Sequence, residues 1–174
     1  SRIRTFRSPS LGIQSMTTKL ATALEFETRI DISEPVRESM VELLNQQLAD
    51  SLDLYTQVKQ AHWNVKGMKF MSLHLLFDNL AANFLRYADT IAERATALGG
   101  RAMGTVRMAA ANSQLDELSC DLTEGDEFLV AMSDRFARYA ASSRTAINRC
   151  EMEHDAVTAD LFTEITREVD KSLY

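Results

Sequence analysis

Apolar residues recur at steps of three and four over most of the chain, which is the spacing of one face of an α-helix. Four such stripes can be followed. Ser33 is the predicted N-cap of the first helix, with Pro35 in its first turn, and Gly67 is expected to end it. The predicted helices span residues 33–67, 72–98, 126–149 and 155–174.

The segment 101–125 lacks a sustained helical pattern and shows only one weak helical patch, around 115–118. Connections of this length are uncommon in compact domains unless they cross over or carry a function. Four long helices with one long connection between the second and third have the connectivity of ferritin-like proteins. We therefore expect an all-α, ferritin-like four-helix bundle domain over residues 33–174, with a short helix in the long connection.

Composition supports a single globular domain. The chain has 174 residues, of which 45% are hydrophobic and 25% are charged. Cys120 and Cys150 are too few for a disulfide scaffold and suit a reducing compartment, so we expect a cytoplasmic protein. No apolar run approaches the roughly 20 residues of a membrane span, so no membrane partner is expected.

Charge is unevenly distributed along the chain. The net charge is −6, but residues 1–24 contain no acid and four basic residues, so the remainder carries −10. An acidic body attracts cations and repels nucleic acid, and a basic tail does the reverse. We expect residues 1–32 to form a mobile basic N-terminal arm. The alternatives for the segment before Met16 are a start-site artefact and part of a targeting peptide.

The second predicted helix has two different faces. With 100° per residue, Asp78 and Glu93 lie within about 40° of Asp89, opposite the main apolar stripe. The acidic face nevertheless also carries Leu75 and Leu85. A helix that is partly apolar on both sides is expected to be covered on both, by its own bundle and by another subunit across a two-fold axis.

Mixed imidazole and carboxylate side chains suggest a metal site. His62 and His74 lie near a helix on which Asp89 and Glu93 are one turn apart, and such ligands suit Fe(II), zinc or manganese. The simpler alternatives are a hydrogen-bonded core histidine and a solvated acidic pair beside arginines. Trp63, next to His62, could donate an electron, although packing is the simpler role.

Three blocks of sequence resemble the Dps family, the DNA-protecting mini-ferritins. The first is residues 62–78 (HWNVKGMKFMSLHLLFD), and the second is residues 88–94 with the following 98–100. Residues 155–162 are similar to a third family block. Together the blocks span about residues 34–174 in the expected order, which is far more specific than a lone metal motif.

The resemblance implies a hollow homo-oligomeric shell, a dodecamer, that oxidises Fe(II) with hydrogen peroxide or O2 and stores the ferric mineral. It implies a ferroxidase site at a two-fold interface, with iron as the metal and zinc as its substitute. By motif position, His62 and His74 would be ligands from one chain. Asp89 and Glu93 would come from the other chain, with Asp78 at or beside a second metal position.

The family also suggests an iron-uptake pore on a three-fold axis, lined by acids at the start of the last helix. His154, Asp155 and Asp160 are the candidates here, although Asp155 also suits an N-cap. Asn148 stands where a family acid is often found. Glu151 and His154 form a single Glu-x-x-His motif of the kind that larger ferritins use twice, and we discount it because it falls at a predicted helix break.

Many family members bind DNA through a mobile basic tail, so the basic residues of the arm are candidate DNA contacts, with association at the nucleoid. The rival function is a shell that coats DNA around a degenerate or zinc-occupied metal site. A soluble di-iron oxygenase fits poorly because its paired Glu-x-x-His motifs are missing. The candidate contacts are Arg2, Arg4, Arg7 and Lys19.

Overall fold

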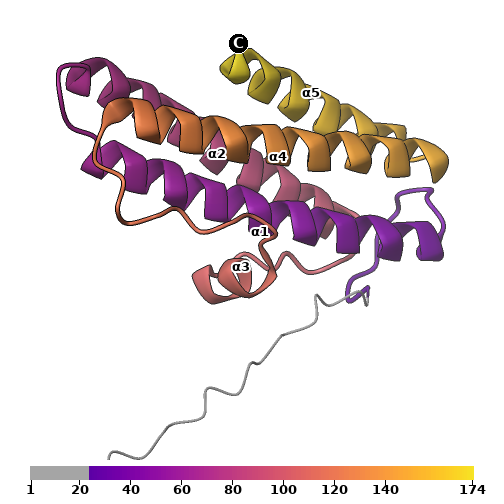
Figure 1. Cartoon of the computed structure of the whole chain (residues 1–174). Coiled ribbons are helices and arrows are strands. Elements are labelled where there is room, and N and C mark those ends of the chain that lie inside the picture. The colour runs from indigo at the N-terminus through magenta and orange to yellow at the C-terminus, as the bar shows by residue number, and fades with distance from the viewer. Residues whose placement is uncertain (1–23) are drawn as a thin grey trace, which may run out of the picture.

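The computed structural model describes residues 24–174, and every regular element among them is a helix (Figure 1). This confirms the predicted all-α fold. The candidate DNA contacts in residues 1–23 lie outside the described residues. The helices are α1 (Glu34–Asn64), α2 (Phe70–Ala97), α3 (Val106–Asn112), α4 (Gly125–Met152) and α5 (Ala156–Leu173).

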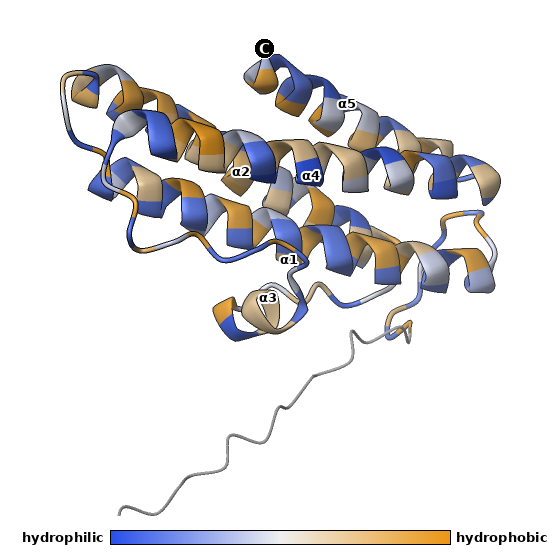
Figure 2. Cartoon of the chain, in the orientation of Figure 1, coloured by the Kyte–Doolittle hydropathy of each residue, from blue (hydrophilic) through white to orange (hydrophobic). Residues whose placement is uncertain are grey.

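The four long helices lie lengthwise against one another, with α2 beside α1 and α5 beside α4 (Figure 1). Polar and apolar residues alternate around each of them (Figure 2), as the helical spacing predicted. Phe84 of α2 meets the rings of Phe136 and Tyr139 of α4 edge-on, at centroid distances of 5.1 and 5.3 Å. This aromatic cluster fills the middle of the bundle.

Helix starts follow the predicted caps. Ser33 is the N-cap residue of α1, and Pro35 lies in the first turn. Asp155 caps α5 by accepting a hydrogen bond from the backbone N–H of Thr158 at 3.0 Å. Among the helices of residues 24–174, none combines the length and the apolar character that crossing a membrane would require.

The short helix in the long connection does not lie where the sequence pattern placed it. It is α3, at 106–112, whereas residues 115–118 are not helical. Thr105 caps α3 by accepting from the backbone N–H of Met108, and three consecutive alanines favour the helix. Leu118 is only 2% exposed and packs an irregular segment of the connection against the core. This position is therefore apolar because it is buried, although it is not part of a helix.

Residues 24–32, which the sequence placed in the expected arm, contact the helices of the bundle. The backbone N–H groups of Glu25 and Phe26 both donate to the carbonyl of Gly99, at 2.9 and 3.0 Å. Ile30 and Ile32 are partly buried against the core. Residues 24–32 therefore belong to the folded domain, because they cover the end of α2.

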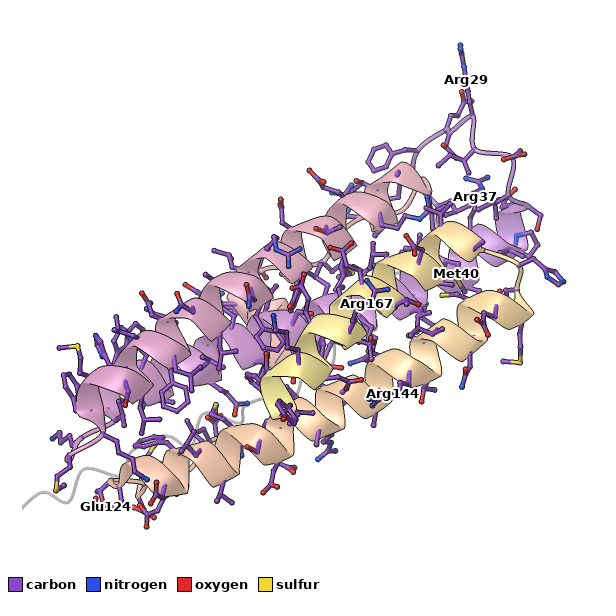
Figure 3. All side chains as sticks on the ribbon, turned by 90° about the horizontal axis from the view of Figure 1, so that it is seen from above. Arg29, Arg37, Met40, Glu124, Arg144 and Arg167 are labelled. Carbon is purple, nitrogen blue, oxygen red and sulfur yellow. The ribbon has the colours of Figure 1, made fainter. Side chains whose placement is uncertain are left out.

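The two ends of the bundle carry different parts of the candidate site. Figure 3 shows Glu124 at one end and Arg37 towards the other. The α1–α2 turn lies at the Glu124 end, where the backbone of Lys66 forms an isolated parallel β-bridge with that of Glu124. The C-terminus of α2 lies at the opposite end, where Arg37 donates to the carbonyl of Leu98 at 3.0 Å. Residues far apart along α2 therefore lie far apart in space.

Candidate metal centre

His62 and His74 form a stacked pair where the end of α1 meets the start of α2. Their ring centroids are 3.7 Å apart and the rings are inclined by 23°. His62 is buried, at 8% exposure, and His74 is half-buried beside the ring of Phe70. The pair is therefore held in place by packing within the chain.

Reciprocal hydrogen bonds fix the orientation of both rings. His62 Nδ1 lies 2.8 Å from the carbonyl oxygen of His74, and His74 Nδ1 lies 2.9 Å from the carbonyl oxygen of His62. A carbonyl oxygen only accepts, so each Nδ1 must carry the hydrogen. In the neutral ring this leaves the Nε2 lone pair free, which is the usual arrangement of a histidine metal ligand.

Asp78 lies one helical turn after His74 and approaches the same pair. Its Oδ1 is 3.9 Å from His62 Nε2 and accepts a hydrogen bond from Lys59 Nζ at 2.8 Å. The hydrogen bond and charge of Lys59 hold the pKa of the Asp78 carboxyl below its usual value. The carboxylate is thus ionised at neutral pH and already has a cation beside it.

Asp89 and Glu93 are exposed on α2, and their side chains form no hydrogen bond or ion pair with any residue in 24–174. The nearby arginines do not neutralise them. Arg86 pairs with acids of α5, and Arg94 pairs with Asp155. These two carboxylates therefore differ from an ordinary solvated pair, because the cations next to them in sequence are committed elsewhere.

The imidazoles and these two carboxylates do not meet within one chain. His74 and Asp89 are separated by about 22 Å along α2, at 1.5 Å per residue. Accordingly, residues 24–174 of a single chain contain no group of three histidine, cysteine, aspartate or glutamate side chains placed to hold a metal. One chain therefore presents the candidate ligands as two separate groups, the His62–His74–Asp78 group and the Asp89–Glu93 group, which we call half-sites.

An exposed stripe joins the half-sites, and we call it the outer stripe of α2. Its positions follow one another at steps of three and four, so they share one face of the helix. Leu75 is 55% exposed and Leu85 is 51% exposed, which is unusual for leucines aligned on one face. Leu85 and Asp89 also line a hollow of about 780 Å³ between α2, α1 and the connection after α2. The stripe comprises Met71, Leu75, Asp78, Ala82, Leu85, Asp89 and Glu93.

Comparison with known proteins identifies the family to which this fold belongs. Residues 41–174 match the model of the ferritin-like domain family. The chain is 34% identical over 148 residues to the DNA protection during starvation protein of Agrobacterium fabrum, covering 85% of this chain and 91% of that protein. This chain belongs to the Dps family of ferritin-like proteins. The recognised resemblance and the predicted ferritin-like fold are confirmed.

Solved structures of the family agree with the fold. DpsA14 from Streptomyces coelicolor matches with a TM-score of 0.82 and 26% identity, over 88% of this chain and 90% of that one. Dps from Listeria innocua, in a crystal soaked with zinc, matches with a TM-score of 0.73 and 26% identity, over 76% and 90% of the two chains.

The candidate pore residues lie around the α4–α5 turn. His154, with φ +62°, and Asp160 are exposed and line a hollow of about 490 Å³ together with Glu151. Asp155, in contrast, is 1% exposed and is committed to Arg94 and the cap of α5, so its carboxylate is not available to a pore. Asn148 is exposed on α4, and Glu151 and His154 straddle the end of that helix.

Two features of the site were missed from the sequence. Lys59 lies three residues before His62, a spacing that places it on the same helix face, but a single lysine in α1 gave no reason to choose it. Its ammonium contacts Asp78 and lies 5.7 Å from the ring centroid of Trp63, which is 65% exposed. The second feature is the pair of reciprocal hydrogen bonds between His62 and His74. These bonds depend on tertiary packing, so no sequence pattern indicates them.

Proposed function

We propose that this protein is a ferroxidase and iron-storage mini-ferritin. It oxidises Fe(II), with hydrogen peroxide as the main oxidant and O2 as the alternative, at sites shared between two subunits. The ferric mineral is stored inside a hollow homo-oligomeric shell, which we take to be the dodecamer implied by the family resemblance.

The observation that carries the proposal is that the two half-sites lie towards opposite ends of the outer stripe of α2. The stacked histidines offer two Nε2 atoms at one end, and Asp89 and Glu93, which have no side-chain partner among residues 24–174, offer carboxylates nearer the other. The exposed leucines of the outer stripe, Leu75 and Leu85, would be removed from water if another protein surface packed against them. A second copy of the outer stripe would supply that cover and the missing ligands together.

An antiparallel pairing of two α2 helices meets this requirement. The centre of the His74–Asp78 pair and the centre of the Asp89–Glu93 pair each lie about 11 Å along the helix from a point level with residues 83–84, between Ala82 and Leu85 of the outer stripe. A two-fold axis through that point brings the histidines of one chain opposite the carboxylates of its partner. Such an isologous interface generates two identical sites per dimer.

The donor set fits iron as the substrate. Neutral imidazoles and carboxylates suit Fe(II), and hard carboxylate oxygens also suit the Fe(III) product. Two Fe(II) ions held together can reduce one peroxide molecule by two electrons, so hydroxyl radical need not be released. Holding the reactants in one site makes the step effectively unimolecular. Zinc fits the same ligands and is the substitute that would block the site without redox chemistry.

A stopped-flow experiment tests the oxidation. Assembled, metal-free protein is mixed with Fe(II) and peroxide, and ferric absorbance is followed in wild type, in His62→Ala and in Glu93→Gln. We expect both variants to lose the fast phase. The matched control is Asp134→Ala, which removes an exposed carboxylate of α4 outside the site. Equal rates in all four proteins would refute the ferroxidase assignment and favour a DNA-coating shell with an inactive metal site.

DNA protection is the second part of the proposal, because the curated relative in Agrobacterium fabrum is named for it. The four basic residues of the arm are the proposed contacts, and a shell would repeat them many times over, giving salt-dependent multivalent binding. With iron and DNA as its partners, we place the shell in the cytoplasm at the nucleoid. Deletion of residues 1–23 should abolish retardation of DNA in a low-salt gel-shift assay, and unchanged retardation would exclude the arm.

A further inference from the structure

A row of polar side chains along α1 holds the long connection between α2 and α4, which runs beside that helix (Figure 1). The members of the row share one role, because each forms a hydrogen bond with a backbone group of the connection. Asp50 is the only one of them that can carry a charge. They are Asn45, Gln46, Asp50 and Gln57, which bond backbone groups of residues 101 and 103, 112, 114 and 116 in turn.

Asp50 is a buried carboxyl group that has no cation beside it. It is 2% exposed, and its Oδ1 accepts a hydrogen bond from the backbone N–H of Gln114 at 2.7 Å. The side-chain amide of Gln46 is a more distant donor, 3.4 Å from both oxygens. No lysine, arginine or histidine among residues 24–174 pairs with this carboxyl. Buried charges in proteins are normally paired, so the ionised form of Asp50 is costly at this position.

Ser113 connects Asp50 to a second carboxylate. The hydroxyl of Ser113 donates to Asp53 Oδ2, and Asp53 also accepts from Gln57 Nε2 at 3.1 Å. The same hydroxyl lies within hydrogen-bonding reach of Asp50. A hydroxyl that donates its single hydrogen to one carboxylate can only accept from the other. A proton on Asp50 would therefore complete a chain of hydrogen bonds from Asp50 through Ser113 to Asp53.

We propose that Asp50, Ser113 and Asp53 form a pH-dependent clamp, which holds the connection against α1 more firmly in mild acid and less firmly as the pH rises. The clamp contains none of the proposed metal ligands, so it would operate whether or not the protein oxidises iron. Ala102 and Gly104 of the same connection line the 780 Å³ hollow next to the outer stripe of α2. The clamp therefore steadies one wall of the surface that a second subunit would cover.

The direction of the pH dependence follows from the surroundings of Asp50. Burial raises the pKa of this carboxyl above its usual value. The hydrogen bonds from Gln114, Gln46 and Ser113 lower the pKa by less, and the charge of Asp53 raises it further. In an open, solvated connection an aspartate titrates near about pH 4. The closed state therefore binds the proton more tightly than the open state, so closure is favoured as the pH falls from neutrality through the native pKa, and the gain is complete below the open-state value.

The other groups near Asp50 keep their charge state over this range. Tyr139 of α4 interacts electrostatically with it, and burial raises the pKa of this phenol, which stays neutral. Arg135 of α4 donates to a glutamine side chain and two backbone carbonyls, and to neither aspartate. Residues 112–115 include no ionisable side chain, and none from α2, α3 or α5 bonds Asp50 in the described chain. The next charged groups along the connection and α4 pair with each other, Asp116 with Arg138.

Hydrogen exchange at Gln114 measures the clamp directly, because its backbone N–H is the donor to Asp50. The assembled full-length protein is exchanged into deuterated buffer between about pH 5 and 8, and protection is corrected for the intrinsic pH dependence of exchange. We expect the protection of residues 113–116 to increase as the pH falls, by at most about tenfold per pH unit, since one proton is bound. Protection that stays constant or decreases in acid in the wild-type protein would overturn the proposal.

Three variants show whether Asp50 is the titrating group. Asp50→Asn keeps an oxygen for the Gln114 N–H but cannot ionise, so protection should lose its pH dependence and at neutral pH exceed that of wild type. Asp53→Asn removes the neighbouring charge and should move the change in protection to lower pH. The matched control is Asp116→Asn, which removes an exposed carboxylate of the same connection and should keep the wild-type profile. A wild-type pH dependence in Asp50→Asn, or its loss in Asp116→Asn, would exclude Asp50 as the sensor.

Discussion

Arg94 donates hydrogen bonds from Nη2 to both carboxylate oxygens of Asp155, at 2.8 and 3.0 Å, and so joins the last turn of α2 to the N-terminus of α5. Arg94 Nε also donates to Thr158 Oγ1 at 2.9 Å. Burial alone would raise the pKa of the Asp155 carboxyl, but the hydrogen bonds from Thr158 and Arg94 outweigh burial and lower it. The residue next to Glu93 is therefore fixed by a buried ion pair.

Asp155→Asn should lower the free energy of unfolding by about 2–3 kcal/mol at pH 7, because it leaves the Arg94 charge unpaired. The native pKa lies below the unfolded one, so the stabilisation is present above about pH 4 and is lost as pH falls through the native value. Urea unfolding at several pH values measures this. The gap between wild type and variant should narrow in acid, whereas Asp160→Asn, an exposed change on the same helix, should differ by less than about 0.5 kcal/mol throughout.

Subunit mixing can show whether the site is shared. His62→Ala and Asp89→Ala should each be inactive alone. After the two are co-assembled at random, half of the dimers are mixed, and a mixed dimer has one intact site and one doubly defective site. About a quarter of wild-type ferroxidase activity should therefore return. No recovery in verified mixed assemblies would place all four ligands within one chain or outside the site.

A charge in the outer stripe should prevent assembly. Leu85→Glu places a carboxylate at the proposed two-fold axis, where it would be buried against its own copy. We expect smaller particles in light scattering, loss of iron oxidation and an unchanged helical circular dichroism spectrum. Val130 is an exposed apolar residue of α4, at 64% against 51% for Leu85, and Val130→Glu should leave particle size unaltered. Dissociation by both variants would argue against the outer stripe as the specific interface.

Gly99 supports the segment that closes the end of α2. Its φ is +90°, and a Cβ at this position would lie 2.5 Å from the carbonyl oxygen of Phe26. Gly99→Ala should therefore destabilise the fold by about 1–3 kcal/mol in thermal or urea unfolding. Gly104→Ala is the control, because its added Cβ would make ordinary contacts with the side chains of Leu48 and Leu52. A similar cost for both would show that strain at Gly99 is not the cause.

The long helices were predictable because their apolar spacing and caps agree. Ser33 and Asp155 mark true helix starts, and the two glycines after α2 follow its end. The sequence pattern placed the short helix at 115–118 because Leu118 is apolar, but this residue is buried in an irregular segment. Over so few residues, periodicity cannot distinguish a buried irregular segment from a short helix. The root of the arm was misjudged because its attachment to Gly99 uses backbone groups, which sequence composition does not reveal.

The site was only partly predictable. The shared face of Asp89 and Glu93 follows from helix geometry, and their lack of partners within the described chain agrees with it. The pairing of Arg94 with Asp155 could not be foreseen, since the two residues are 61 positions apart and the contact depends on the docking of α5. An oppositely charged residue that is adjacent in sequence, such as Glu93 beside Arg94, was therefore a poor guide to the ion pair that forms in the fold.

The 22 Å between the half-sites has a further consequence for timing. On the proposed arrangement, a newly made chain binds iron only incompletely, and the onset of oxidation is second order in subunit concentration. Dilute chains would leave Fe(II) and peroxide untouched, and turnover would begin only when encounters between subunits become frequent. The rate of protein synthesis would then set the moment at which a cell starts to withdraw iron from solution.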